Sequence, residues 1–370
     1  MFTHLHTHSH FSFGQGASSP EALIAAAVRR GFTALACTDT NGVYGAVEFQ
    51  RAAESAGIRP ILGAHLVHGG EECVVLAEDE RGWGTLCRVI SAIHWSSLTP
   101  RPPLHIRGEG EPQRRAPLPR QGEGLGEGAG QGENLISQHL QDRTGLSLLS
   151  TDIALLERLA ATSGTAGLYA ELRPGKERHA VLAAAARLGI PPVASGAVMF
   201  AHPEDWTTHR LLLAIASNVA LSEVDSLAAS PSRRLAARDA WLRPAPDIAR
   251  HFPDRPDAID RAGEIAERCR YRIPIGRTVP PRTRDVSESF QQLHALAYEG
   301  AQRRYGTIAP FVRDRIEHEL AIIGMKEFAD YFLVVHDIVT HGPTHCGRGS
   351  VANSIVSYCL GITHVEPLGA

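Results

Sequence analysis

Short apolar runs alternate with amphipathic segments over most of the first 270 residues of the chain. The apolar runs predict strands at 2–6, 33–38, 60–67, 74–77, 146–150, 168–172 and 192–200. The amphipathic segments predict helices at 20–31, 43–57, 82–94, 152–163, 176–188, 202–219 and 246–268. The first helix has clear end signals, with Ser18 or Ser19 as N-cap and Gly31 as its stop. Strands that alternate with helices usually pair in parallel, so we predict an α/β fold built on a parallel sheet or barrel.

Two segments interrupt this pattern. Residues 101–134 are rich in Gly, Pro, Glu and Arg and almost free of apolar side chains, so they cannot bury enough surface to fold and are predicted to be a disordered insertion. Residues 276–285 lie in a proline-rich stretch and are predicted to be a linker. The remainder, 286–370, is predicted to be helix-rich, with helices at 287–305 and 311–340. The first domain is therefore expected at 1–275.

Charge and cysteine content narrow the possible functions. The 370 residues contain 37 Lys and Arg against 40 Asp and Glu, a net charge of −3, so any contact with nucleic acid is expected to be local. The six cysteines are scattered singly, which argues against a disulfide framework or zinc ribbon and fits a reducing cytoplasm. The N-terminus lacks the features of a signal peptide, and no apolar run approaches about 18 residues, so no membrane association is expected.

The segment HTHSH places His6, His8 and His10 at alternate positions. Alternate side chains of a strand share one face, so these imidazoles are predicted to converge. Asp39 follows the 33–38 strand at its carboxyl end, where the active sites of parallel barrels lie. Such a group could bind Zn²⁺ or Mn²⁺ for phosphoester hydrolysis. Solvated polar residues at a strand end would show the same spacing, and the spacing alone leaves both interpretations open.

A second candidate site lies near the end of the sequence. Gly347, Arg348, Gly349 and Ser350 form a Gly-Arg-Gly-Ser turn ahead of a segment of small and apolar residues that predicts a helix, with Ser350 as its N-cap. Glycines allow close approach of the backbone, a helix N-terminus offers free N–H groups, and arginine adds a fixed positive charge. These features predict a phosphate-binding turn.

Two sets of motifs resemble one protein family. The stretch HLHTHSHFSFGQGASSPEALIAAAVRRGFTALACTDTNG, from residue 4, looks like the start of the PHP (polymerase and histidinol phosphatase) domain of bacterial C-family DNA polymerases, the DNA polymerase III alpha subunits. The segments RIEHEL, YFLVVHDIV and CGRGSVANSIVSYCLGITHVEP resemble the start of the polymerase palm, and the short CGRGSVANS form is closer to the error-prone branch. The resemblance implies a distorted (β/α) barrel followed by a helix-rich partial palm.

The sequence departs from the family at most of the expected metal ligands. His6 and His8 supply the His-x-His of the first strand, but Asp39 is followed by Thr40 instead of His, and His65 stands where the family commonly has Glu. Where the family has Asp-x-His near the end of the barrel, this chain has Ala197 and Met199; we therefore expect a structural barrel with at most a weak site at His6, His8 and Asp39, and leave the role of His65 open.

For the palm, the resemblance implies that Gly347, Arg348, Gly349 and Ser350 hold the triphosphate of an incoming nucleotide in the intact, Mg²⁺-dependent polymerase, whose partners are DNA and deoxynucleoside triphosphates. The paired catalytic aspartates of the family are absent, so the chain looks truncated and is expected not to extend a primer alone. A downstream polymerase fragment and other replisome subunits are candidate partners. Two alternatives stay open: a free-standing PHP phosphoesterase or 3′–5′ exonuclease, and a non-catalytic module that binds nucleotides or a polymerase.

Overall fold

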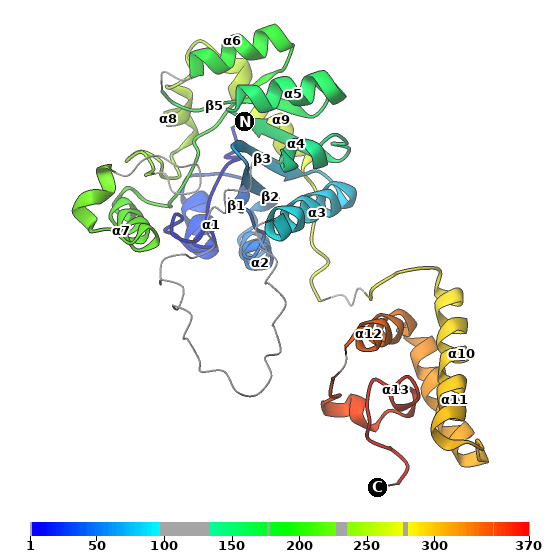
Figure 1. Ribbon diagram of the computed structural model, residues 1–370. Coiled ribbons are helices and arrows are strands. Elements are labelled where there is room, and N and C mark those ends of the chain that lie inside the picture. Colours follow the sequence, from blue (N-terminus) through cyan, green and yellow to red (C-terminus); the bar gives the residue numbers. More distant parts are fainter. Residues whose placement is uncertain are drawn as a thin grey trace, which may run out of the picture. The chain divides into compact units, whose positions relative to one another are not determined.

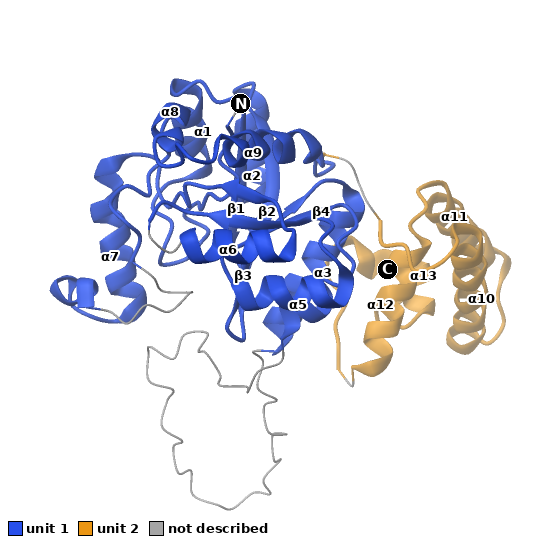
Figure 2. Ribbon diagram, turned by 90° about the horizontal axis from the view of Figure 1, so that it is seen from above, with its two compact units in different colours: residues 1–275 blue, residues 276–370 orange. Residues whose placement is uncertain are grey.

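A computed structural model describes residues 2–96, 134–175, 178–226, 235–276, 280–342 and 344–369. The chain divides into two compact units, unit 1 (Met1–Ile275) and unit 2 (Gly276–Ala370), which Figure 2 shows in different colours. Of the predicted insertion, 101–133 lies outside the described residues. Among the described residues, no helix is long and apolar enough to cross a membrane.

Unit 1 is built on a six-stranded sheet whose strands follow one another in sequence order. The strands are β1 (Ala34–Thr40), β2 (Arg59–His68), β3 (Glu71–Ala77), β4 (Leu146–Ser150), β5 (Leu168–Leu172) and β6 (Pro192–Ala194). β1 pairs with β2 in parallel, and β4, β5 and β6 are parallel neighbours, as the alternating pattern predicts. β3 is antiparallel to both of its neighbours. The expectation of a wholly parallel sheet was wrong here, because Gly69 and Gly70, both with positive φ, turn the chain back as a two-residue hairpin.

The N-terminal segment, residues 2–8, closes the sheet into a barrel. On one side, the amide of Ala36 donates to the carbonyl of His4 (3.0 Å) and that of Thr38 to the carbonyl of Thr7 (2.8 Å). On the other side, Thr7 forms a parallel bridge with Val198, just beyond β6. The segment therefore lies between β1 and the chain that follows β6, which confirms a distorted barrel. Residues 2–6 form no regular strand, and the segment 192–200 forms only isolated bridges, at Val198 and Phe200, beyond Pro192–Ala194; both strands were predicted to be more regular than they are.

Helices surround this barrel (Figure 1). They are α1 (Pro20–Arg29), α2 (Ala46–Ser55), α3 (Glu80–Ser96), α4 (Leu135–His139), α5 (Ile153–Ser163), α6 (Arg178–Leu188), α7 (Trp206–Ser217), α8 (Ala245–Ala249) and α9 (Pro256–Arg268), with short 3₁₀ turns at Pro203–Asp205 and Leu221–Ser226. The first helix ends as predicted: the Ser19 hydroxyl accepts the amide of Ala22, and Gly31 has φ +73°. The helix predicted at 246–268 is two helices, with Pro253 and Pro256 near the break.

Unit 2 is all-helical in its described part. It contains α10 (Val286–Tyr305), α11 (Pro310–Met325), α12 (Ala329–His341), a 3₁₀ turn at Gly349–Asn353 and α13 (Ile355–Cys359). Leu293, Ile316, Leu320 and Ile355 are buried together in its own apolar core. The helix predicted at 311–340 is interrupted between α11 and α12, where Glu327 adopts a left-handed φ of +55°.

Candidate functional site

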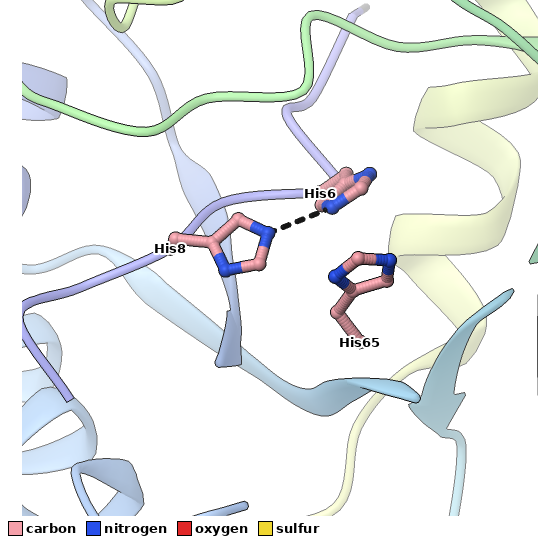
Figure 3. A group of neighbouring side chains, drawn as sticks. All are labelled: His6, His8 and His65. Carbon is pink, nitrogen blue, oxygen red and sulfur yellow. Dashed lines mark hydrogen bonds between the residues drawn. The ribbon is translucent and has the colours of Figure 1, made fainter. Parts of the chain in front are cut away.

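Three histidines from two segments meet inside unit 1 (Figure 3). His6 and His8 lie on the N-terminal segment, and His65 lies on β2. One ring nitrogen from each approaches to within 4.8 Å of the other two. The side chains are buried, with exposed fractions of 1%, 0% and 3%. The alternation in HTHSH thus brings His6 and His8 together as predicted, whereas the third predicted member, His10, is exposed because the chain turns after Ser9.

The outer nitrogens of His6 and His65 face carboxylates. His6 Nδ1 lies 2.7 Å from Glu171 Oε1, and His65 Nε2 lies 3.1 Å from Glu72 Oε1. An ionised carboxylate can only accept a hydrogen bond, so both outer nitrogens carry the proton. In a neutral imidazole the opposite nitrogen then has no proton and carries a lone pair. The inner nitrogens, His6 Nε2 and His65 Nδ1, are therefore acceptors, and His65 Nδ1 is buried without a hydrogen-bond partner.

The third ring is oriented by a serine. The Ser12 hydroxyl donates its proton to Asp39 Oδ1 (2.7 Å), so its oxygen is left to accept from His8 Nδ1 at 2.8 Å. This leaves a lone pair on His8 Nε2, which faces His6 Nε2 at 2.9 Å, the contact drawn as a dashed line in Figure 3. Each of the three inner nitrogens thus presents a lone pair to the same small volume.

Burial keeps the imidazoles of His6 and His8 neutral. It lowers the pKa of His6 to about 4, despite the opposing effect of Glu171, and lowers the pKa of His8 well below its ordinary value. At neutral pH the lone pairs of these two rings are therefore available as ligands. Neutral imidazole is a favourable ligand for zinc and other transition metals.

One arginine holds both outer carboxylates. Arg173 lies 2.7 Å from Glu171 Oε2 and 3.1 Å from Glu72 Oε1. Burial alone would raise the pKa of Glu171, but Arg173 and His6 outweigh it and hold that pKa well below its usual range. Burial is likewise outweighed at Glu72, where His65 and Arg173 lower the pKa to about 2. Sequence reasoning missed Glu171, Glu72 and Arg173, although a glutamate inside the apolar run LYAEL was a usable signal.

Asp39, which was expected to be a metal ligand, is hydrogen-bonded to two serines instead. Its carboxylate accepts hydrogen bonds from the amide of Ser9 (2.7 Å), the hydroxyl of Ser9 (2.8 Å) and the hydroxyl of Ser12. In the described part of the chain, the group with converging ligand atoms consists of His6, His8 and His65, and no carboxylate joins it. The arrangement is suited to one ion held by nitrogen, and lacks the bridging carboxylates that a multinuclear centre needs.

The Gly-Arg-Gly-Ser turn lies in unit 2, on the surface. Arg348, Gly349 and Ser350 are exposed, and Gly349 has φ +68°. Gly347 packs closely on Thr363, where an added Cβ would come within 3.1 Å of that side chain. The turn continues into a 3₁₀ helix, and Ser354, rather than the expected Ser350, caps α13 through the amide of Ser357.

The N-terminus of α13 is already bonded to a carboxylate from α11. Glu319 accepts from the Ser354 hydroxyl (2.8 Å) and from the amides of Ile355 and Val356 (both 3.2 Å). Its other contact is with Arg315, at 2.9 Å. The exposed turn around Arg348, and not the start of α13, is therefore the part of this region left for a ligand.

Two protein families match the chain, in the order of its two units. The PHP domain family matches residues 4–173, and the family described as bacterial DNA polymerase III alpha NTPase domain matches residues 291–370. An error-prone DNA polymerase of Symbiobacterium thermophilum is 35% identical over 99% of this chain and 35% of its own length. The DNA polymerase III subunit alpha of Bacillus subtilis is 30% identical over 99% of this chain and 32% of its own length. The chain thus spans about a third of the length of these relatives.

Among solved structures, an amidohydrolase from Chromobacterium violaceum, with bound sulfate and no metal, is similar over 54% of this chain and 88% of its own. Its sequence identity is 18% and its TM-score 0.34, so the likeness is weak and the sequence relatives carry the comparison.

Proposed function

We propose that the chain is the N-terminal part of a bacterial DNA polymerase III alpha subunit of the error-prone type. In its intact form such a subunit would carry out template-directed DNA synthesis with Mg²⁺, with DNA and deoxynucleoside triphosphates as substrates. Two observations support this proposal. The PHP match precedes the polymerase match along the chain, and the relatives, which are polymerases, align over 99% of it.

Within this function, we assign the turn Gly347–Ser350 to the triphosphate of the incoming nucleotide. The observation that carries this is the exposed guanidinium of Arg348 on a glycine-flanked turn, for which no ion-pair partner is found within the described residues. Glu319, the nearby acid, is bonded to Arg315 and to α13 instead. An arginine without an internal partner is free to bind a phosphate through paired N–H groups.

For unit 1, we propose a supporting barrel rather than a hydrolase. The three histidines are buried, so a phosphoester has no direct contact with them, and Asp39 is engaged by Ser9 and Ser12. A metal-dependent phosphoesterase is the second candidate, favoured by the convergence of His6, His8 and His65. Release of p-nitrophenol from p-nitrophenyl phosphate by the purified chain with Zn²⁺ or Mn²⁺ would support that candidate and contradict the supporting role.

Nucleotide binding tests the assignment of the turn. We expect the purified chain to bind a deoxynucleoside triphosphate with Mg²⁺ in a calorimetric titration, and Arg348→Ala to weaken binding by about tenfold or more, because a hydrogen bond to a charged group contributes about 1.5–3 kcal/mol. Arg313→Ala, which removes another exposed arginine of unit 2, is the matched control and should leave the affinity unchanged. If the Arg348 variant binds the nucleotide as tightly as the unaltered chain, the turn is not part of the binding site.

A further inference from the structure

We propose that unit 1 binds a phosphate group of a single nucleic-acid strand through Arg29, Arg30 and His202. These three side chains meet where the C-terminal end of α1 lies against the turn that precedes α7. The site shares no residue with the histidine cluster of the barrel or with the Gly347–Ser350 turn. The proposal therefore does not depend on the assignment of that turn to a nucleotide.

The imidazole of His202 lies between two guanidinium groups. Its Nε2 is 2.9 Å from Arg29 Nη2, and its Nδ1 is 3.4 Å from Arg30 Nη2. A guanidinium can only donate hydrogen bonds, and a neutral imidazole has one acceptor nitrogen, so the ring can accept from only one of the two arginines. The shorter contact, to Arg29, is the hydrogen bond, and the N–H group at Nδ1 then faces an N–H group of Arg30. An oxygen atom at about 2.8 Å from both donors would satisfy them.

The position of the arginines at the end of α1 does not by itself explain this arrangement. Basic side chains at a helix C-terminus interact with the last carbonyl groups, and Arg30 does donate to the carbonyl of Ala26 at 3.2 Å. That role needs no contact with His202, which comes from a part of the chain more than 170 positions away. In the part of the chain that the structure describes, neither Arg29 nor Arg30 forms an ion pair. Two fixed positive charges therefore converge on a donor without a paired anion.

The acids of the neighbouring turn, Pro203–Asp205, leave this charge largely unbalanced. Asp205 accepts hydrogen bonds from the hydroxyl of Ser18 and the amide of His202, both at 3.1 Å. Glu204 is exposed and forms no ion pair with the described residues. Burial and the charge of Arg29 lower the pKa of Arg30, and Glu204 opposes this only in part. A phosphate group offers several charged oxygens, so it can accept paired N–H groups from two guanidiniums at once.

Arginines stacked on tryptophans adjoin the cluster, and they favour a nucleic-acid strand as the source of the phosphate. The guanidinium of Arg30 lies 5.2 Å from the centre of the Trp241 ring, and that of Arg238 lies 4.3 Å from the centre of the Trp206 ring. Trp206 begins α7, directly after the turn that starts at His202. Arg238 is exposed and has no ion pair among the described residues. Single strands bind to surfaces of this composition, because cations contact their phosphates and their bases stack on aromatic rings and guanidinium planes.

Titration of the full chain with a short oligothymidylate, followed by tryptophan fluorescence, tests this. All tryptophans lie in unit 1, so the signal reports binding to this unit. Every protein in the series carries Arg348→Ala, so that the turn proposed for nucleotides cannot contribute. We expect Arg29→Ala to weaken binding by about tenfold, and to reduce the slope of log affinity against log salt by about 0.7, the value for one phosphate of a single strand. Arg88→Ala, which removes an exposed arginine of α3, is the matched control and should change neither.

Because Arg29 is exposed, its replacement should leave the thermal unfolding midpoint unchanged, so a loss of affinity reports the site and not the fold. Inorganic phosphate, added at constant ionic strength and at the same concentration of phosphate groups, should not displace the strand. Displacement would identify free phosphate as the ligand and overturn the strand. The proposal is also overturned if oligothymidylate leaves the fluorescence unchanged, if Arg29→Ala loses no affinity, or if Arg88→Ala loses as much. A response that Arg348→Ala alone abolishes would instead assign the strand to the turn in unit 2.

Discussion

The two candidate sites of this chain differ in how their polar groups are satisfied. In unit 1, the outer nitrogens of the histidine cluster are hydrogen-bonded to Glu171, Glu72 and Ser12, and the cluster is closed to solvent. In unit 2, Arg348 extends into solvent from a glycine-flanked turn. A buried cluster suits a small ion that stays bound, and an exposed arginine suits a ligand that arrives and leaves.

The charges of the two units show the same contrast. Arg173 of unit 1 pairs with two glutamates, one of them fully buried, whereas Arg282 of unit 2 pairs with the half-exposed Glu327. Breaking a buried pair leaves a charge without water or partner, while water replaces the partner of an exposed one. Stability should therefore depend on ion pairs in unit 1 far more than in unit 2.

Replacing Arg173 should have the largest effect. We expect Arg173→Ala to lower the unfolding free energy of unit 1 by about 3–5 kcal/mol, because Glu171 keeps its hydrogen bond from His6 but is left buried without its positively charged partner. All four tryptophans, Trp83, Trp95, Trp206 and Trp241, lie in unit 1, so their fluorescence during urea unfolding follows this unit alone.

Arg282→Ala, the matched change in unit 2, should cost less than about 1 kcal/mol, measured by far-ultraviolet circular dichroism. Equal losses in the two variants would contradict the contrast between buried and exposed pairs.

Glu319 offers an intermediate effect within unit 2. We expect Glu319→Ala to destabilise this unit by about 1–2 kcal/mol, because the Ser354 hydroxyl and the amides of Ile355 and Val356 lose their acceptor. Circular dichroism should show the loss while tryptophan fluorescence stays unchanged. Glu299→Ala, at an exposed position of α10, should leave both signals within about 0.5 kcal/mol of the unaltered chain. A shift in the fluorescence transition would show that Glu319 also stabilises unit 1.

Local signals explain which parts of the fold could be predicted. α1 was predicted because Ser19 caps it and Gly31 ends it, and both act within a few residues of the helix. The turn at Gly69 and Gly70 was also visible in the sequence, and reading it would have predicted the antiparallel β3. Gly324 lies three residues before the break at Glu327, but a single glycine within a helical pattern is a weak stop signal, so the helix was predicted through it.

The candidate metal centre was only partly predictable, since half of it depends on long-range contacts. His6 and His8 converge because they are two residues apart in extended backbone. His65 reaches them through the pairing of β1 with β2, in which it lies opposite Thr40, and Glu171 contacts His6 across 165 positions of sequence. Neither contact can be derived from spacing. Asp39 was expected as a ligand from its place after a strand, but the serines of the 9–12 turn engage it.

The smallest expected effect concerns pH and one histidine away from the cluster. Burial lowers the pKa of His209, with partial opposition from the carbonyl of Gln15. Its Nδ1 donates to that carbonyl at 2.6 Å, and its Nε2 accepts a hydrogen bond from the amide of Ala236 at 3.0 Å. Protonation of Nε2 would therefore place its new N–H group directly against the N–H group of Ala236. Because the folded pKa lies below the unfolded one, the unfolded state binds more protons as the pH falls below the usual histidine value of about 6.5. The unfolding free energy of unit 1 should therefore fall with pH in that range.

The variant His209→Gln isolates this contribution, since a glutamine amide can donate to Gln15 and accept from Ala236 but does not titrate. Measured by tryptophan fluorescence in chelator-treated protein, its stability should fall less steeply below pH 6.5 than that of the unaltered chain. The difference should be small, because His4 and His6, both with pKa lowered to about 4 by burial, titrate in the same direction and remain in the variant. Identical pH profiles would contradict this prediction, because they would show that the folded barrel accommodates protonated His209 at no cost, with the amide of Ala236 finding another acceptor.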